Sequence, residues 1–364
     1  MTEVRTQKIV RLGIDVENLS ELNFVTGIQR VATETNRSLF SLASRNFKYR
    51  GVITNSIEQS KNFETNSYLA EDPILSNDLA SLEELDVFLS LDHNWKIDFD
   101  KIRLAKQEKD LFAIFLVHDV IPLHFPEFFA IPNAKRMFQV YLQKIFQVAD
   151  VLIVTSEKVR NDIVDLNWTF NGEIKVVPLG AFEIYPYARF HNSEFNLLYV
   201  ATLEPRKGHL DLLDAFDILR EQGHSPNLNI VGRRGWLDEE IYSRITNHEA
   251  FGGRLRWFSG ISDNELAALY ESTNLVVMPT QEEGFGLGLE EAIANQRKVL
   301  VRRINVFLER AQDNVYFFEG DPKDLAAAIE KVCKMDWVTG SKPVRTIKSF
   351  AEEIHDLIVN KLKI

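Results

Sequence analysis

The chain has 364 residues, of which 45% are hydrophobic and 26% charged. This composition is typical of globular proteins, and the length suits two α/β domains of about 150 to 200 residues each. The formal net charge of −11 argues against binding to duplex nucleic acid, because such proteins need clustered cations to displace counterions from phosphates. The single cysteine, Cys333, excludes an internal disulfide framework and a cysteine-rich metal site. The cytosol is therefore the expected location.

The N-terminal residues lack the basic start, apolar run and cleavage site of a secretory signal, and they predict a strand instead. No apolar run approaches the ~18 residues needed to span a bilayer. A peripheral contact with the inner face of the membrane stays open, because residues 123–132 are rich in aromatic residues and the next helix carries Lys135, Arg136 and Lys144. The alternative, which we favour, is a core-packed helix with a solvated face.

Short β-branched or aromatic runs alternate with longer stretches of helical period, which is typical of parallel sheets covered by helices on both faces. The first half predicts strands at residues 9–16, 47–53, 86–91, 111–117, 151–155 and 174–178. The second half predicts strands at 195–201, 228–232, 254–259, 274–280 and 298–302. A helix is expected over 208–223, with one apolar face made by Leu212, Leu213, Phe216 and Leu219.

The strand and helix pattern starts afresh near residue 195. Residues 178–194 contain a glycine, two prolines and no clean period, so we expect an interdomain linker there. The predicted fold class is α/β, with Rossmann-like domains over 1–185 and 186–344. The last helix, within 345–364, is expected to pack back on the first domain.

A glycine-rich turn at residues 284–288 follows the predicted strand 274–280 and leads into a helical pattern. Such a turn brings backbone N–H groups close to an anion, and the helix N-terminus favours negative charge, which predicts a cradle for a diphosphate. Glu283 before the turn and Glu291 after it could accept hydrogen bonds from hydroxyls at the two ends of a nucleotide sugar. The alternative is that both glutamates only complement the helix dipole.

Cations follow two strands of the second half, where parallel sheets usually bind ligands. Arg206 and Lys207 come after strand 195–201, and Arg233 and Arg234 come after strand 228–232. Adjacent cations at this edge could neutralise a leaving diphosphate. The alternative is a solvated surface pair.

In the first half, His118 and Asp119 end the strand 111–117, where the imidazole could bond a sugar hydroxyl or act as a purely structural group. Thr26 and Gly27 lie between the first strand and a helix, where a backbone N–H could meet a phosphate or simply make a turn. The histidines have no HExxH-like spacing, and the Asp98 to Asp100 pair lacks a strand end beside it, so no metal is expected.

Taken together, these motifs resemble the family 4 retaining glycosyltransferases with the two-domain GT-B fold, over nearly the whole chain. The family pattern EGFGLPxLEA stands here as EGFGLGLEEA at residues 283–292. Further matches, in chain order, are TGIQRV, HDVIPLHFPE, VVPLG, LEPRKG and SGISDNELAALY, the last with a capping box from Ser262 to Glu265.

The resemblance implies two domains that face each other across a cleft and close around the donor. For the sugar part of the donor, it implies contacts from Glu283 and His118, with Glu291 at the ribose and Ile261 at the base. For the diphosphate, it implies Arg206 and Lys207. The backbone of Phe285, Gly286 and Leu287 would contact both the sugar and the phosphates. The implied mechanism is a front-face substitution in which the departing phosphate helps to deprotonate the acceptor hydroxyl, with the cations stabilising the leaving group.

Three departures from the family pattern stand out. Gly288 replaces a proline, residues 296–299 read QRKV in place of GxPV, and Ala201 and Thr202 stand where many members have Gly-Arg. The customary phosphate cation is then either missing or supplied by Arg233.

The expected function is transfer of a hexose to a glycan or lipid-linked saccharide in polysaccharide biosynthesis, without a metal or other cofactor. Mannose from GDP-mannose and glucose from a UDP donor both remain open. The alternative is a non-catalytic GT-B partner that scaffolds another transferase, motivated by the altered loop and the missing Gly-Arg.

Overall fold

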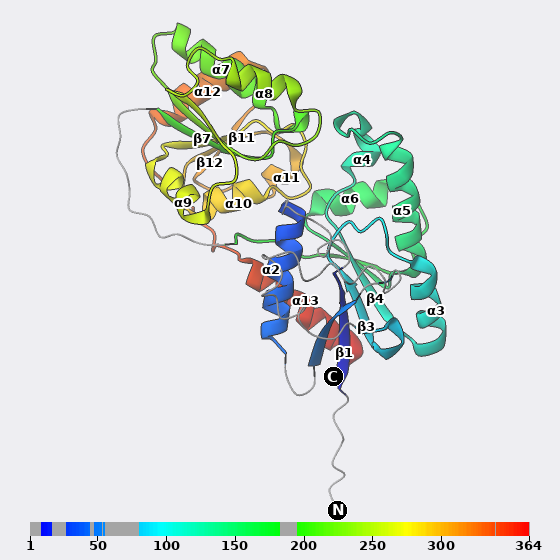
Figure 1. Ribbon diagram of the computed structural model, residues 1–364. Coiled ribbons are helices and arrows are strands. Elements are labelled where there is room, and N and C mark those ends of the chain that lie inside the picture. Colours follow the sequence, from blue (N-terminus) through cyan, green and yellow to red (C-terminus); the bar gives the residue numbers. More distant parts are fainter. Residues whose placement is uncertain are drawn as a thin grey trace, which may run out of the picture. The chain divides into compact units, whose positions relative to one another are not determined.

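The computed structural model describes residues 9–16, 27–43, 47–52, 54, 80–182, 195–338 and 340–363. The chain divides into two compact units (Figure 1). The first unit comprises Met1–Val120, Arg136–Gly180 and Thr346–Ile364, and the second comprises Ile121–Lys135 and Ala181–Arg345. Residues 121–135 thus group with the second unit, although the expected boundary at residue 185 assigns them to the first half. Most of the expected linker, residues 183–194, lies outside the described residues.

The first unit is built on a six-stranded parallel sheet with the order β2-β1-β3-β4-β5-β6. All six strands coincide with the apolar runs that predict them. Their bounds are β1 Val10–Asp15, β2 Phe47–Val52, β3 Val87–Ser90, β4 Phe112–Val117, β5 Val151–Val154 and β6 Glu173–Val176.

Helices cover both faces of the first sheet, as parallel sheets require. Figure 1 shows α2 and α13 over one face and α3 and α5 over the other. The C-terminal helix α13 belongs to this unit and packs against α2. The bounds are α2 Gly27–Ser41, α3 Phe99–Lys109, α4 Ile121–His124, α5 Ala134–Val148, α6 Glu157–Asp165 and α13 Ile347–Leu362, with short 3-10 turns at Leu82–Glu84 and Pro126–Phe128.

The second unit contains another six-stranded parallel sheet, with the order β12-β11-β10-β7-β8-β9. Five of its strands are the predicted ones. The sixth, β12, is formed by the short run VYFF and was not predicted as a strand. The bounds are β7 Asn196–Val200, β8 Asn227–Val231, β9 Leu255–Phe258, β10 Leu275–Met278, β11 Val299–Arg302 and β12 Val315–Phe318.

Helices α7, α8 and α12 lie over one face of the second sheet, and α9 and α10 over the other (Figure 1). The predicted apolar face of α7 is confirmed, because all four of its residues are fully buried. The bounds are α7 His209–Glu221, α8 Glu239–Thr246, α9 Asp263–Ser272, α10 Leu287–Ala294, α11 Asn305–Leu308 and α12 Pro322–Cys333, with a 3-10 turn at Pro205–Lys207.

Both sheets reverse their chain order once. In the first sheet the reversal lies between β1 and β3, and in the second it lies between β7 and β10. Ligands of doubly wound sheets bind outside the carboxyl ends of the strands at such a point. A ligand site is therefore expected at the loops that follow these four strands.

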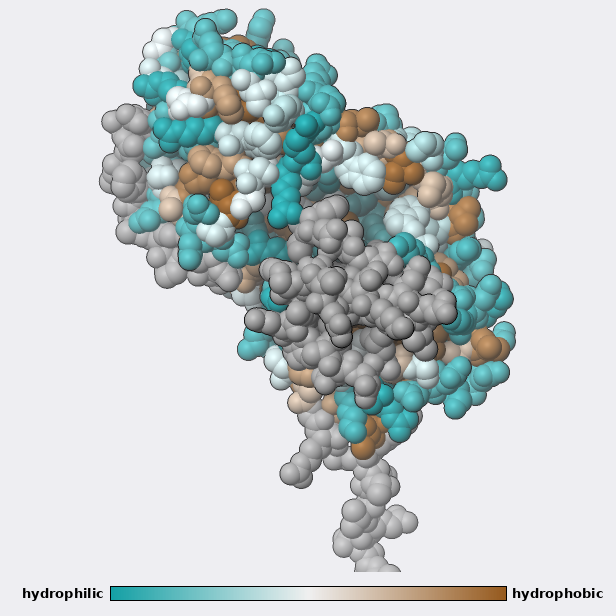
Figure 2. Space-filling model, viewed as in Figure 1, coloured by the Kyte–Doolittle hydropathy of each residue, from teal (hydrophilic) through white to brown (hydrophobic). Residues whose placement is uncertain are grey.

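The surface in Figure 2 is mostly hydrophilic, and its hydrophobic residues lie in small separate groups. Within the described part of the chain, no helix is both long and apolar enough to cross a membrane.

Candidate functional site

Two loops meet at the reversal point of the second sheet. Residues 201–208 follow β7, and residues 279–286 follow β10. The strands pair in parallel with Leu197 opposite Leu275 and Leu198 opposite Val276, so their carboxyl ends emerge side by side. Both motifs that the sequence predicts as phosphate-binding elements thus lie at the same edge of the same sheet.

The two loops are fastened to each other through their backbones. The Gln281 N–H donates to the Arg206 carbonyl at 2.8 Å. Gly208 has a φ of +71°, and a Cβ atom there would lie 2.4 Å from the carbonyl oxygen of Pro279. Because glycine alone fits both the left-handed backbone and this close approach, Gly208 allows the loops to touch.

A buried ion cluster, consisting of Glu204, Arg206, Lys207 and Glu283, joins the loops through side chains. Glu283 is 8% exposed, and its carboxylate accepts hydrogen bonds from the Lys207 ammonium and, at 3.3 Å, from Arg206 Nη1. Arg206 also donates through Nε to Glu204 at 3.0 Å and through Nη1 to the Glu282 carbonyl at 3.1 Å. Two predicted phosphate cations and one predicted sugar ligand are therefore in direct contact.

The ion cluster is electrically balanced. Burial acts to raise the pKa of Glu283, but Lys207 and Arg206 outweigh it, so the pKa lies below its ordinary value and the carboxylate is ionised at neutral pH. Two cations thus face two carboxylates inside the cluster.

The glycine turn is held from its outer side. Gly286 has a φ of +89° and caps α10, and a Cβ atom there would lie 2.5 Å from the ring of Phe307. The Arg310 guanidinium lies 4.2 Å from the centre of the buried Phe285 ring and pairs with Glu290 at 2.8 Å. The Leu289 and Glu290 N–H groups donate to the Gly286 carbonyl, so the N–H groups of Leu287 and Gly288 are the ones at this helix start that are suited to an anion.

A tyrosine beneath the loops was not identified from the sequence. Tyr199 is fully buried in β7, and its hydroxyl donates to the Lys207 carbonyl at 2.6 Å and lies 3.0 Å from Thr280 Oγ1. Burial raises the pKa of Tyr199 far above its ordinary value, so the hydroxyl stays protonated. The His209 ring packs against this ring in a tilted arrangement, with 4.8 Å between the ring centres. Burial lowers the pKa of His209 to about 3, which keeps it neutral beside Lys207.

We expect Tyr199→Phe to lower the apparent melting temperature and to speed hydrogen exchange at the amides of Lys207, Gly208 and Gln281. The change leaves the Lys207 carbonyl and the Thr280 hydroxyl without this partner, at a cost of about 1 to 3 kcal/mol. Tyr242→Phe is the matched control, because Tyr242 contacts Arg234 and Trp257 through its ring. Equal effects of the two changes would contradict a role of the Tyr199 hydroxyl.

The remaining predicted residues of the second unit lie at or near the same edge. Glu291 is half-buried in the second turn of α10, and Ile261 is half-buried before α9, whose predicted capping box from Ser262 to Glu265 is confirmed. Arg233 follows β8 and is exposed.

Arg234 is paired with two neighbouring carboxylates. Its guanidinium donates to Asp238 at 2.7 and 2.9 Å and to Glu239 at 2.6 Å. Because carboxylates engage Arg206 and Lys207 in the same way, this pairing does not decide whether Arg234 adds to a phosphate site, and that expectation stays a prediction.

In the first unit, His118 lies at the carboxyl end of β4 and is 7% exposed. Its Nε2 lies 2.9 Å from the Leu91 carbonyl, which can only accept, so Nε2 carries the proton and Nδ1 is the free acceptor position on the ring. Burial lowers the pKa of His118 well below its ordinary value. The ring is therefore neutral and suited to accept a hydrogen bond from a hydroxyl.

Buried polar groups gather at the reversal point of the first sheet. The Asp15 carboxylate accepts from Ser90 Oγ at 3.1 Å and from Asn94 Nδ2 at 3.0 Å. His93 accepts from the His118 N–H at 3.4 Å and packs edge-on against its ring. Gly27 is the first residue of α2, and Thr26 lies outside the described residues.

The altered QRKV loop lies at the opposite edge of the second sheet, because residues 296–298 precede β11. Lys298 is buried and donates to the carbonyls of Val332 and Met335 at 2.8 and 2.9 Å, where it caps α12. The Arg297 guanidinium lies 5.0 Å from the Trp337 ring centre. These substitutions thus serve packing at the amino ends of the strands.

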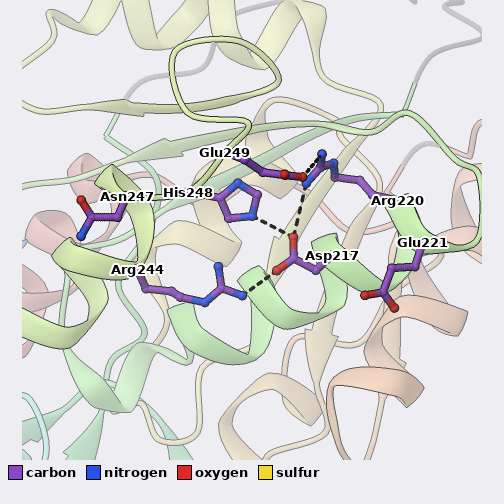
Figure 3. A pocket seen from close by; sticks show the side chains of 7 residues that line it. All are labelled: Asp217, Arg220, Glu221, Arg244, Asn247, His248 and Glu249. Atoms are coloured by element: carbon purple, nitrogen blue, oxygen red, sulfur yellow. Dashed lines mark hydrogen bonds and ion pairs between the residues drawn. The ribbon is translucent and has the colours of Figure 1, made fainter.

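A hollow of about 490 Å³ is lined by residues of α7, α8 and the segment that follows α8. Figure 3 shows Arg244 and His248 converging on Asp217, at 2.6 and 2.7 Å, while Arg220 pairs with Glu249. Ala250 N–H donates to His248 Nδ1 at 3.0 Å, so Nε2 carries the proton that Asp217 accepts. The charges of this hollow are directed at one another, which ties α7 to α8.

We expect Asp217→Asn to reduce stability at pH 7 by about 1 to 2 kcal/mol, because it removes charged acceptors from Arg244 and His248. Burial acts to raise the pKa of Asp217, but the hydrogen bonds from Arg244 and His248 outweigh it and the pKa is lowered.

A lowered pKa in the fold stabilises it above the ordinary aspartate value of ~3.9, and this contribution is lost as the pH falls through the lower value. Thermal unfolding from pH 7 downward should therefore show a constant gap between wild type and variant that narrows below about pH 4. A gap that widens on acidification would contradict the assignment.

Comparison with known proteins adds a family and a fold. Residues 187–352 match the family described as "Glycosyl transferases group 1". This range contains both loops of the candidate site. Among the described residues, no group of three or more His, Cys, Asp or Glu side chains is arranged to hold a metal ion.

The serotype-specific mannosyltransferase WbdA of Escherichia coli is 30% identical over 351 residues, which cover 88% of this chain and 41% of WbdA. The chain thus spans less than half the length of this relative. Among solved structures, a sucrose-phosphate synthase from Thermosynechococcus elongatus is similar, with a TM-score of 0.69, 16% identity, and 97% of this chain and 99% of that one covered.

The Anabaena protein HepE in complex with UDP and glucose is also similar, with a TM-score of 0.67, 15% identity, and 96% of this chain and 99% of that one covered. At such identities the likeness concerns the fold. The chain therefore has the GT-B fold, and its residues 187–352 match the glycosyl transferases group 1 family.

Proposed function

We propose that the chain is a retaining glycosyltransferase that moves a hexose from a nucleotide diphosphate sugar to a glycan or lipid-linked saccharide in polysaccharide biosynthesis. The observation that carries this proposal is the ion cluster, in which Glu283 contacts Arg206 and Lys207 at the reversal point of the sheet in the region that matches the glycosyl transferases group 1 family. Cations for a diphosphate and a carboxylate for sugar hydroxyls are the groups that a nucleotide sugar requires.

Within the second unit, Arg206 and Lys207 neutralise the diphosphate, and the N–H groups of the turn at Phe285, Gly286 and Leu287 bind its oxygens. Glu283 accepts a hydrogen bond from the hexose, and Glu291 accepts from the ribose. Ile261 contacts the base, and Arg233 contributes a further cation. Their common location at one sheet edge, where parallel sheets bind nucleotides, supports this assignment.

In the reaction, the bond between the anomeric carbon and the phosphate oxygen breaks, and the acceptor oxygen attacks from the same face. The departing phosphate takes the acceptor proton, so no enzyme nucleophile takes part. Arg206 and Lys207 stabilise the charge that develops on the leaving diphosphate, which is the main electrostatic demand of the step. With two cations available, the reaction needs neither a metal nor another cofactor.

For the first unit we retain the assignment of His118 to the hexose and of Gly27 to a phosphate. A neutral imidazole with its Nε2 proton bonded to Leu91 supports the role of His118 as a hydrogen-bond acceptor. The His118 imidazole does not suit the role of a general acid toward the hexose, since the ring is uncharged at neutral pH.

Mannose and glucose are the candidate hexoses. The name of WbdA, a mannosyltransferase, supports mannose, whereas UDP and glucose bound to HepE support a UDP donor. The chemistry of the ion cluster suits either, because it recognises the diphosphate and a hydroxyl and not the base.

The decisive experiment measures nucleotide release from UDP-, GDP-, ADP- and dTDP-sugars in the presence of a saccharide acceptor, with and without EDTA. We expect release from one donor that persists in EDTA, and a loss of at least 100-fold for Glu283→Ala, in line with removal of a group that acts in the transition state. Glu239→Ala is the control, because Glu239 is an exposed carboxylate of the same unit paired with Arg234.

A product anomer inverted relative to the donor would contradict retention, and activity lost in EDTA would contradict metal independence. Unchanged activity of Glu283→Ala would contradict the site. The second candidate, a non-catalytic GT-B partner, would release no nucleotide from any donor. One of its two motivations is weakened, because the altered loop at 296–298 packs against α12.

The location we propose is cytoplasmic. Helix α5 packs on the core through Phe138, Leu142 and Ile145, and we propose that its solvated face also makes a peripheral contact at the inner face of the membrane. Lys135, Arg136 and Lys144 are exposed on α5, as are Met137 and Val140 at 46% and 45%. Such a stripe of cations and apolar groups suits an anionic lipid surface.

We expect the protein to co-sediment with anionic liposomes at low salt and not with neutral ones. Replacing Lys135, Arg136 and Lys144 together by glutamine should abolish co-sedimentation, while Lys334, exposed on the second unit, serves as the control position. Wild-type protein that stays in the supernatant would remove the membrane contact.

A further inference from the structure

Glu283 engages the donors that a diphosphate needs. Lys207 Nζ and Arg206 Nη1 both donate to its carboxylate, and Arg206 Nε is engaged by Glu204. All of these side chains are mostly buried, with 11% to 19% of each exposed. In such surroundings, charged hydrogen bonds are strong and a competing anion must replace them.

The net charge of the ion cluster indicates how strongly Glu283 competes with a diphosphate for Lys207 and Arg206. Two cations and two carboxylates cancel within the ion cluster, so a diphosphate gains no net attraction while Glu283 stays in place. At about 4 Å, two like charges repel by ~4 kcal/mol at an effective dielectric constant of 20. Glu283 and a phosphate oxygen therefore compete for Lys207.

We propose that Glu283 acts as an exchangeable anion: the diphosphate of the donor displaces it from Lys207 and Arg206, and the freed carboxylate then binds the hexose hydroxyl. This inference rests on the proposed function and adds a sequence of binding steps to it. The phosphates bind first, and their binding releases the Glu283 carboxylate that then binds the hexose.

The backbone stays in place during this exchange. Gln281 is bonded to the Arg206 carbonyl, and Gly286 is packed against Phe307, so both ends of residues 281–286 are anchored. The exchange is therefore a change in the side-chain torsions of Glu283.

The exchange has a consequence for the product. After transfer, the hexose leaves with the acceptor, and Glu283 loses its hydroxyl partner while the nucleoside diphosphate is still bound. Glu283 then competes for Lys207 and Arg206 and promotes release of the nucleoside diphosphate. Wild type should thus bind a nucleoside diphosphate more weakly than a variant in which no carboxylate at position 283 competes for Arg206 and Lys207.

The test is calorimetric titration of UDP and GDP into wild type and Glu283→Gln. The variant keeps the shape of the side chain and removes its charge, so we expect it to bind the matching nucleoside diphosphate about tenfold more tightly, equivalent to ~1.4 kcal/mol. If Glu283 instead contributed to the affinity for the diphosphate, Glu283→Gln would bind the nucleoside diphosphate more weakly than wild type.

Two controls separate the exchange from other effects. Glu239→Gln removes one carboxylate of the same unit outside the ion cluster and measures the general effect of net charge. Glu283→Asp keeps the charge and, if glutamine disturbs the fold, provides a second test, because it should bind the diphosphate less tightly than Glu283→Gln. The parent nucleosides, which lack phosphate, should bind wild type and Glu283→Gln equally.

Equal or weaker binding of the diphosphate to Glu283→Gln, with clear binding to wild type, would overturn the exchange and leave the proposed function standing. Failure of both proteins to bind UDP or GDP, and ADP or dTDP in the same titration, would overturn both, because the variant has its cations unopposed by Glu283. An equal gain in Glu239→Gln would also overturn the exchange.

Discussion

The pairing of β10 with β7 is the constraint on which the candidate site depends. The chain forms β8 and β9 before it returns to the other side of β7, so two loops that are far apart in sequence leave the sheet side by side. Gly208 allows them to touch, and the Tyr199 hydroxyl bonds both from below. Without this pairing, Glu283 would have no cations, and the cations would be an ordinary surface pair.

The positions of the strands and of the two loops could be predicted because they depend on local patterns. Apolar runs gave eleven of the twelve described strands. β12 was not predicted, because VYFF is a run of only four residues, although Gly320 and Pro322 follow it. The glycine turn was identifiable because three glycines lie within five residues, and Gly286 among them has a left-handed backbone.

Contacts that depend on the fold could not be read from the sequence. Nothing in the sequence around Tyr199 distinguishes it from any apolar strand residue, yet its hydroxyl joins the two loops. The partnership of Arg310 with Phe285 and Glu290 likewise joins residues that follow different strands. The pairing of Arg234 with Asp238 and Glu239 was also not predicted, because the sequence shows charges and positions but not which side chains meet.

The cations at the carboxyl edge of the second sheet differ in their hydrogen-bond partners. This difference determines whether a cation has a structural role or can bind a phosphate. Arg302 donates to the carbonyls of Pro279 and Gly320 and pairs with Asp211, so it fastens three segments of the backbone. A cation held by backbone carbonyls cannot change partners without loosening the fold. Arg206 and Lys207 instead share the flexible side chain of Glu283, and Arg206 also donates to the Glu282 carbonyl. An acidic chain can therefore present cations to a phosphate where a movable carboxylate engages both of them in the meantime.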